Sequence, residues 1–117
     1  TFSKNRCICY IGDTDQEGEL LSPDQYRVQS AIGWGVKNYD NLIVCCLHGM
    51  SRSSAIAFLI ETKLNGIQKG LDLLDKAVHW PNSLIIALGS QYLKIPRLND
   101  DIREWKIEAR KAQKLYG

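Results

Sequence analysis

Residues 42–60, LIVCCLHGMSRSSAIAFLI, constrain the fold of this chain more than any other stretch. The apolar run over residues 41–46 predicts a buried strand, and residues 52–64 predict a helix that is buried nearly all round. Asn65 and Gly66 would end that helix with a left-handed cap. A strand that leads through a short loop into a helix presents several backbone N–H groups together, and such a cluster binds anions.

One more strand and one more helix are predicted before this motif. Residues 6–11, RCICYI, are apolar and bounded by polar residues, which predicts a buried strand. Ser22, Pro23 and Gln25 form a helix-start signal, and the helix should run to about residue 37. The residues expected on its buried side are Tyr26, Ile32 and Val36, with Val28 and Tyr39 as further candidates.

Three helices are predicted after Gly66. The first covers residues 67–78, where the apolar residues recur at the spacing of one helix face: Ile67, Leu71, Leu74 and Val78. The second covers residues 84–93 and would be capped by Asn82 or Ser83. The third follows Pro96 with Asn99 as its cap, and it carries acidic residues first and basic residues later, as the helix dipole favours. Its Lys and Arg side chains are expected to form a solvated face together with Glu104 and Glu108.

This order of elements predicts an α/β fold with a central, mostly parallel sheet flanked by helices and a helical C-terminal half. The 117 residues are expected to form one domain. A sheet of this kind normally has more than two strands, so the predicted strand content is low on the N-terminal side. The chain is therefore expected to lack N-terminal structure or to take strands from elsewhere.

Composition limits the partners and the location that we expect. The net charge of +2 is too small to favour nucleic-acid or membrane binding through bulk electrostatics. No apolar run approaches the roughly 18 to 20 residues that span a bilayer. The four cysteines are Cys7, Cys9, Cys45 and Cys46, whose pairs suit neither a disulfide scaffold nor a zinc site. We interpret them as reduced thiols and expect a cytoplasmic protein.

The loop before residue 52 has the composition of a phosphate cradle with a nucleophile at its base. Gly49 lets the backbone curl round a tetrahedral anion, and the Arg52 guanidinium can bind two phosphate oxygens at once. These groups would lower the pKa of Cys46 from about 8.5 into a range of roughly 3.5 to 7.5. Ser53 can donate a hydrogen bond to the sulfur and ease its departure from a covalent intermediate. The amides expected to hold the phosphoryl group belong to Leu47, His48, Gly49, Met50, Ser51 and Arg52.

The segment CLHGMSRS, residues 46–53, resembles the Cys-x-x-Gly-x-x-Arg-Ser/Thr signature of cysteine-dependent protein tyrosine and dual-specificity phosphatases. The chain is most similar to small bacterial tyrosine-phosphatase-like proteins, in which a Pro-Asn segment, here Pro81 and Asn82, later opens a short apolar helix. The resemblance covers about residues 9–95. It implies a phosphatase-like fold and hydrolysis of phosphotyrosine, with phosphoserine and phosphothreonine as further substrates, through a phosphocysteine. The expected substrate is a phosphorylated protein or a small phosphomonoester, and no metal or cofactor is required.

The resemblance also implies a general acid on a loop some thirty residues before the cysteine. Asp13 and Asp15 lie 33 and 31 residues before Cys46. Such an acid must reach the leaving oxygen from a loop that can close over the substrate. Asp13 is the first candidate, because Gly12 and Asp13 directly follow the predicted strand, and Asp15 is the alternative.

Cys45 stands where the family usually has histidine, and this departure keeps a second function class open. That class is a phosphate-binding module, or pseudophosphatase, without useful turnover. A third class is a rhodanese-like sulfurtransferase, which also carries its cysteine on an anion-binding loop. The spacing from Cys46 to Arg52, with Ser53 directly after it, argues against the third class.

Overall fold

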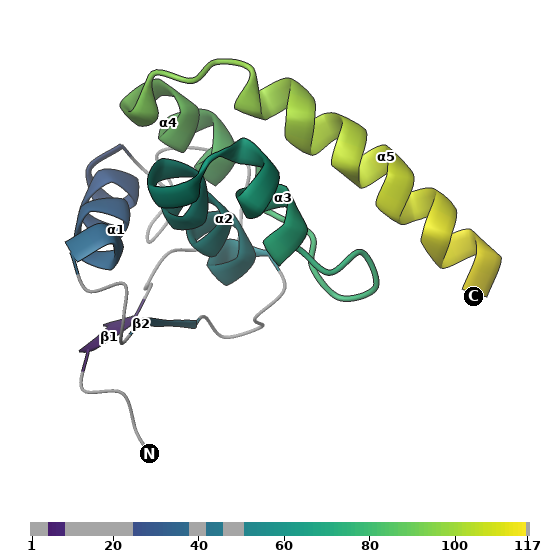
Figure 1. Cartoon of the computed structure of the whole chain (residues 1–117), viewed down its shortest axis with the longest axis horizontal. Helices are drawn as coiled ribbons and strands as arrows, with labels where there is room; N and C mark the ends of the chain where they lie inside the picture. The colour runs from purple at the N-terminus through teal and green to yellow at the C-terminus, as the bar shows by residue number, and fades with distance from the viewer. Residues whose placement is uncertain (1–4, 9–24, 38–41, 46–50, 117) are drawn as a thin grey trace.

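Helix α2 (Arg52–Asn65) lies at the centre of the molecule, with helices packed on several sides of it (Figure 1). The structure is a computed structural model that describes residues 5–8, 25–37, 42–45 and 51–116. Most of α2 is buried, including Ile56, Phe58 and Leu59, each of which is 0% exposed. The prediction of a helix buried nearly all round is therefore confirmed. Gly66 ends α2 with a positive φ of 98°, but its ψ of 166° lies outside the left-handed helical region.

The described part of the chain contains four further helices. They are α1 (Gln25–Lys37), α3 (Ile67–Leu73), α4 (Ser83–Leu93) and α5 (Leu98–Tyr116). Helices α1, α3 and α4 contact α2 directly, whereas α5 packs along α4 and α3. Their inward side chains form one hydrophobic core: Val28, Ile32, Ile85, Ile86, Leu98, Ile102, Trp105 and Ala109, together with the apolar residues of α2.

The described strands are β1 (Asn5–Ile8) and β2 (Leu42–Cys45), and they pair in parallel, with Asn5 opposite Leu42 and Ile8 opposite Cys45. The predicted α/β, phosphatase-like fold with a central sheet flanked by helices is wrong for the described residues. The five helices build the core among themselves, and a pair of four-residue strands has too little surface to serve as a central layer. Figure 1 shows this pair at one end of the helical body.

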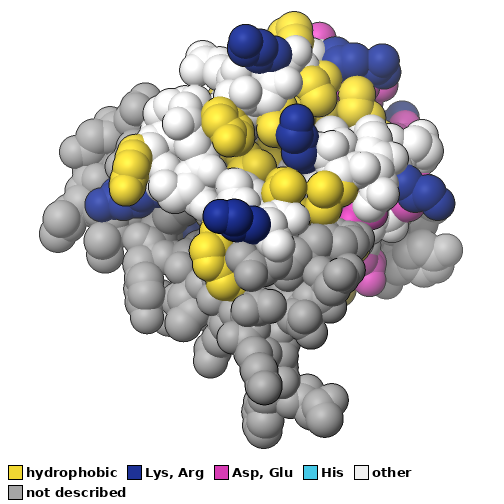
Figure 2. Space-filling model, turned by 60° about the vertical axis from the view of Figure 1, so that its left-hand side comes forward, with side chains coloured by type: hydrophobic (Ala, Val, Ile, Leu, Met, Phe, Trp, Pro, Cys, Tyr) yellow, Lys and Arg dark blue, Asp and Glu magenta, His cyan; other side chains and the backbone are white. Residues whose placement is uncertain are grey.

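The buried side of α1 differs from the predicted one at Tyr26. Val28 and Ile32 are 0% and 1% exposed, as the spacing indicates, but Tyr26 is 79% exposed. Tyr26 lies two positions before Val28, so a helix of 3.6 residues per turn places the two side chains on nearly opposite faces. Figure 2 shows the side of the molecule on which α1 and α4 lie, where hydrophobic side chains reach the surface among Lys and Arg side chains.

Helix α3 is shorter than the predicted helix over residues 67–78. It ends at Leu73, and Leu74 has an extended backbone at φ −79° and ψ 132°. The Asp75 carboxylate then accepts a hydrogen bond of 2.8 Å from the Ala77 amide. An aspartate that bonds to the backbone two residues ahead favours a turn over a helix. As a result Val78 is half exposed and does not join the core, whereas Leu74 remains buried.

The start of α4 follows the predicted capping signal, and the start of α5 does not. The Asn82 side chain accepts a hydrogen bond of 3.0 Å from the Ile85 amide, so Asn82 is the cap of α4. Helix α5 already begins at Leu98, and the Asn99 side chain donates to Ser90 Oγ at 3.2 Å. Asp100 and Asp101 lie in the first turn of α5, as predicted. None of the helices in the described ranges is long and apolar enough to cross a bilayer.

Candidate functional site

Arg52 is the first residue of α2, and its side chain is buried with only 6% of its surface exposed. Ser53 and Ser54, the next two residues, are also buried. A guanidinium at a helix N-terminus meets the positive end of the helix dipole and loses hydration on burial. Such a position suits an arginine that acts on an anion held in front of the helix. The phosphate-binding role of Arg52 stays a prediction, because residues 46–50, which would form the rest of the cradle, lie outside the described residues.

The backbone carbonyl of Ser51 fixes the point at which α2 begins. It accepts hydrogen bonds from the Ala55 amide at 3.2 Å and from Ser54 Oγ at 3.1 Å. It also accepts a bond of 3.0 Å from the Asn82 amide. The last of these joins α2 to a segment thirty residues further along the chain. The Ser51 side chain makes no capping hydrogen bond to α2.

The segment of Pro81 and Asn82 contacts the start of α2. Pro81 is less than 2% exposed, and Asn82 is 5% exposed. The Asn82 amide binds Ser51, while its side chain caps α4. One residue therefore fixes the N-terminus of α4 against the N-terminus of α2. The Pro-Asn motif, quoted above only for its resemblance to the phosphatase family, is thus bound through Asn82 to Ser51, the residue directly before α2.

The parallel register of β1 and β2 shows where the two segments that carry the predicted catalytic residues begin. Ile8 lies opposite Cys45, so both strands end at the same edge of the pair. The segment that carries Asp13 and Asp15 follows β1, and the segment that carries Cys46 follows β2. The other predicted site residues are Leu47, His48, Gly49 and Met50, and together with Asp13, Asp15 and Cys46 they lie outside the described residues.

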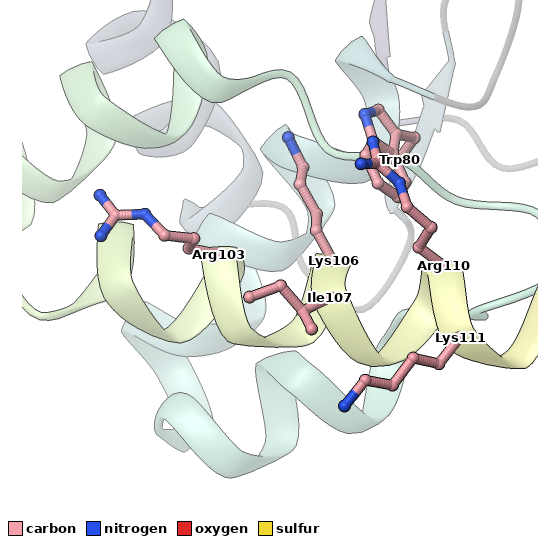
Figure 3. A pocket seen from close by; sticks show the side chains of 6 residues that line it. All are labelled: Trp80, Arg103, Lys106, Ile107, Arg110 and Lys111. Atoms are coloured by element: carbon pink, nitrogen blue, oxygen red, sulfur yellow. The ribbon is translucent and has the colours of Figure 1, made fainter.

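A groove of about 460 Å³ lies between Trp80 and α5, and the sequence interpretation missed it (Figure 3). Trp80 stands at one side, and α5 supplies the remaining lining residues: Arg103, Lys106, Ile107, Arg110 and Lys111. Lys106 Nζ lies 5.1 Å from the centroid of the Trp80 ring, and Arg110 Cζ lies 5.4 Å from it. The basic residues of α5 were expected to form only a solvated face. Trp80 lies outside every helix, so helical periodicity holds no signal for this contact.

A smaller hollow of about 170 Å³ lies next to the groove, at the start of α4. Arg103 and Lys106 line both spaces, and Ser83 lines the smaller one. Lys106 Nζ donates a hydrogen bond of 2.9 Å to Ser83 Oγ. Ser83 directly follows Asn82, which binds Ser51. The groove on α5 is thus connected through two adjacent residues to the beginning of α2.

Comparison with protein-family models, with curated proteins and with solved structures finds no match for this chain. Among the described residues, no group of three or more His, Cys, Asp and Glu side chains is arranged to hold a metal ion. The candidate site is therefore defined by its own residues. These are the buried Arg52, the Ser51 and Asn82 contact, and the loop that precedes them in the sequence.

Proposed function

We propose that this protein hydrolyses phosphomonoesters, phosphotyrosine above all, through a phosphocysteine formed on Cys46. The observation that carries the proposal is Arg52, a buried cation at the first position of α2 and six residues after Cys46. A fork of N–H groups at that position can bind two phosphoryl oxygens while the helix N-terminus stabilises their charge. The amides of residues 47–52 complete the proposed cradle.

The chemistry has two balanced steps. In the first, the Cys46 thiolate attacks phosphorus, the bond from phosphorus to the ester oxygen breaks, and Asp13 gives its proton to the departing phenol. In the second, water attacks the phosphocysteine, Asp13 takes a proton from that water, and the phosphorus–sulfur bond breaks. Ser53 donates a hydrogen bond to the departing thiolate. Inorganic phosphate is released, and Cys46 and Asp13 return to their starting states.

Two features favour Cys46 as the nucleophile over its neighbour Cys45. Cys45 is the last residue of β2, whereas Cys46 begins the segment that leads into α2. Only Cys46 has Gly49 and Arg52 at the spacing of a phosphate loop. The same placement of Cys45, where related phosphatases have histidine, favours the second candidate function. That candidate is a phosphate-binding module that holds phosphotyrosine without useful turnover.

Turnover of p-nitrophenyl phosphate tests the proposal. We expect wild-type protein to release p-nitrophenol in the presence of a metal chelator and to be inhibited by vanadate. Cys46→Ser should abolish this release, because a serine hydroxyl is a far weaker nucleophile without a dedicated base. Wild-type release no greater than that of Cys46→Ser would overturn the enzyme proposal. Binding of phosphotyrosine by the same inactive wild type would then support the binding module.

The choice of general acid is tested in the same assay. We expect Asp13→Ala to lower turnover by about 100-fold or more, since a positioned general acid contributes roughly that factor. Asp15→Ala is the matched control, because it removes a carboxylate two residues away on the same segment. A larger loss in Asp15→Ala than in Asp13→Ala would assign the acid to Asp15 and leave the reaction class intact.

A further inference from the structure

The groove between Trp80 and α5 concentrates positive charge in a protein whose net charge is only +2. Four of its six lining residues are basic: Arg103, Lys106, Arg110 and Lys111. Figure 3 shows that all four come from successive turns of α5, with Ile107 among them and Trp80 on the other side. Such a local concentration of cations attracts an anionic partner even when the bulk charge does not.

The cations of the groove are arranged so that an acidic partner could reach them. Arg103 pairs with Asp100 at 3.4 Å, and both side chains are 72% exposed. Lys111 pairs with Glu108 at 3.7 Å and is also largely exposed. Exposed ion pairs of this kind contribute only about 0 to 1 kcal/mol, so a carboxylate of a partner can replace them with little loss.

Trp80 holds the other two cations in place. Trp80 is partly buried and packs against the hydrophobic core, so its ring is a fixed support. Lys106 and Arg110 lie over this ring, and Lys106 also donates to Ser83 Oγ. Cation–π contacts orient both side chains before any partner arrives, which lowers the entropy cost of binding. Ile107, at 51% exposure, adds an apolar contact beside them.

We propose that this groove binds an acidic segment of a partner protein, with two or more Asp or Glu side chains within three or four consecutive residues. The basic residues extend from Arg103 to Lys111, which corresponds to about 12 Å along a helix. An extended peptide covers that length with about four residues. The volume of about 460 Å³ suits several side chains of such a segment.

An acidic peptide fits the groove better than a nucleic acid does. The Trp80 ring packs against the core, and Lys106 and Arg110 lie over it. Little of the ring surface therefore remains for a stacked base. Glu104 and Glu108 also lie on α5 between the basic residues and would repel a continuous phosphate backbone. Short, separate carboxylates can pair with the cations and avoid these acidic side chains.

Fluorescence anisotropy with the whole chain and a fluorescein-labelled peptide tests the proposal. The probe is a ten-residue peptide that alternates Asp and Glu with Ser and Gly, and a peptide with Asn and Gln in place of Asp and Glu is the neutral comparison. We expect Lys106→Gln combined with Arg110→Gln to weaken binding of the acidic peptide about tenfold. The matched control is Lys63→Gln combined with Lys69→Gln, which removes two exposed cations elsewhere and should leave the affinity unchanged.

Each outcome decides the proposal. Equal affinity in the groove variant and the wild type, equal loss in the control variant, or equal binding of the neutral peptide would overturn it. Tighter binding of a single-stranded RNA oligonucleotide than of the acidic peptide would also overturn it and favour a nucleic-acid surface. If circular dichroism shows that the Lys106 and Arg110 variant is unfolded, Arg103→Gln combined with Lys111→Gln replaces it. Both of these side chains are exposed, and the same tenfold loss is expected.

Discussion

The amide of Asn82 donates a hydrogen bond of 3.0 Å to the carbonyl oxygen of Ser51, and this bond joins the starts of α4 and α2. Ser51 directly precedes Arg52 of the proposed site, and Asn82 directly precedes Ser83, which binds Lys106 of the groove. Because the side chain of Asn82 also caps α4, the starts of α4 and α2 are both held by one residue. Asn82 is therefore the structural link between the candidate site and the groove on α5.

Asn82→Ala should destabilise the protein by about 1 to 2 kcal/mol. The substitution removes the acceptor of the Ile85 amide, and both residues are buried, so water cannot replace the lost bond. Urea denaturation followed by circular dichroism measures the change. Asn82→Asp is the control, because its carboxylate can accept the same bond and favours a helix N-terminus. A stability of Asn82→Ala equal to that of the wild type would show that the cap contributes nothing.

Gly89→Ala should destabilise the contact between α2 and α4 by about 1 to 3 kcal/mol. A Cβ atom at this position would lie 2.7 Å from Leu59 Cδ2 and 3.0 Å from Leu59 Cγ. Leu59 is fully buried in the core and has little room to move. Two helices approach closely here because Gly89 has no side chain. The unfolding midpoint in urea is the measurement.

Gly33→Ala is the matched control for Gly89→Ala, and the opposite sign is expected. Gly33 lies on the exposed side of α1, and no described atom lies within 4 Å of an added Cβ. Alanine should therefore stabilise the helix by roughly 0.5 to 1 kcal/mol through its higher helix propensity. Equal changes in both variants would mean that packing against Leu59 does not limit position 89.

Arg52→Lys should lower the turnover of p-nitrophenyl phosphate by about 100-fold or more. Lysine keeps the charge but loses the planar fork that binds two phosphoryl oxygens. Steady-state kinetics and the affinity for vanadate measure the loss, and vanadate should bind more weakly to the variant. Arg97→Lys is the control, since Arg97 is 69% exposed and pairs with Asp101 on the surface. Full turnover by Arg52→Lys would remove Arg52 from the proposed mechanism.

Features that depend on neighbouring residues were predictable from the sequence. The buried helix α2, the Asn82 cap and the acidic first turn of α5 each follow from residues within about one or two helical turns. Tyr26 shows the limit of this reasoning, because its spacing to Ile32 does not match a helical face. Asp75 shows another limit. Its side chain bonds to the Ala77 amide in a turn, so the helix does not continue to Val78 although the apolar spacing does.

Features that depend on distant residues were not predictable in the same way. The apolar runs suggested a central sheet, but the amount of sheet depends on how many strands pair, which no local pattern contains. Likewise, Trp80 and Arg110 are thirty positions apart, and only the packing of α5 brings them together. The burial of Arg52 was not predicted either, because the sequence reasoning on the phosphate loop used only the spacing from Cys46.

If both proposals hold, the groove should affect which phosphopeptides the enzyme prefers. Lys106 lies between the groove and Ser83, and Ser83 is next to the Asn82 contact with Ser51, so a bound substrate could occupy both regions. We expect the wild type to have a higher kcat/KM for a phosphotyrosine peptide flanked by Asp and Glu than for one flanked by Ser and Gly. Surface ion pairs of about 0.7 kcal/mol each, with two cations involved, correspond to a preference of about tenfold.

Lys106→Gln combined with Arg110→Gln should reduce that preference to near unity, and higher salt should reduce it in the wild type. Phosphate release from the two peptides, measured side by side, gives the ratio directly. The Lys63→Gln and Lys69→Gln variant should keep the preference of the wild type, because these residues lie on α2 and α3, away from the groove. An acidic preference that survives in the Lys106 and Arg110 variant would mean that charge is recognised elsewhere, since the groove would then lack the two cations that Trp80 holds in place.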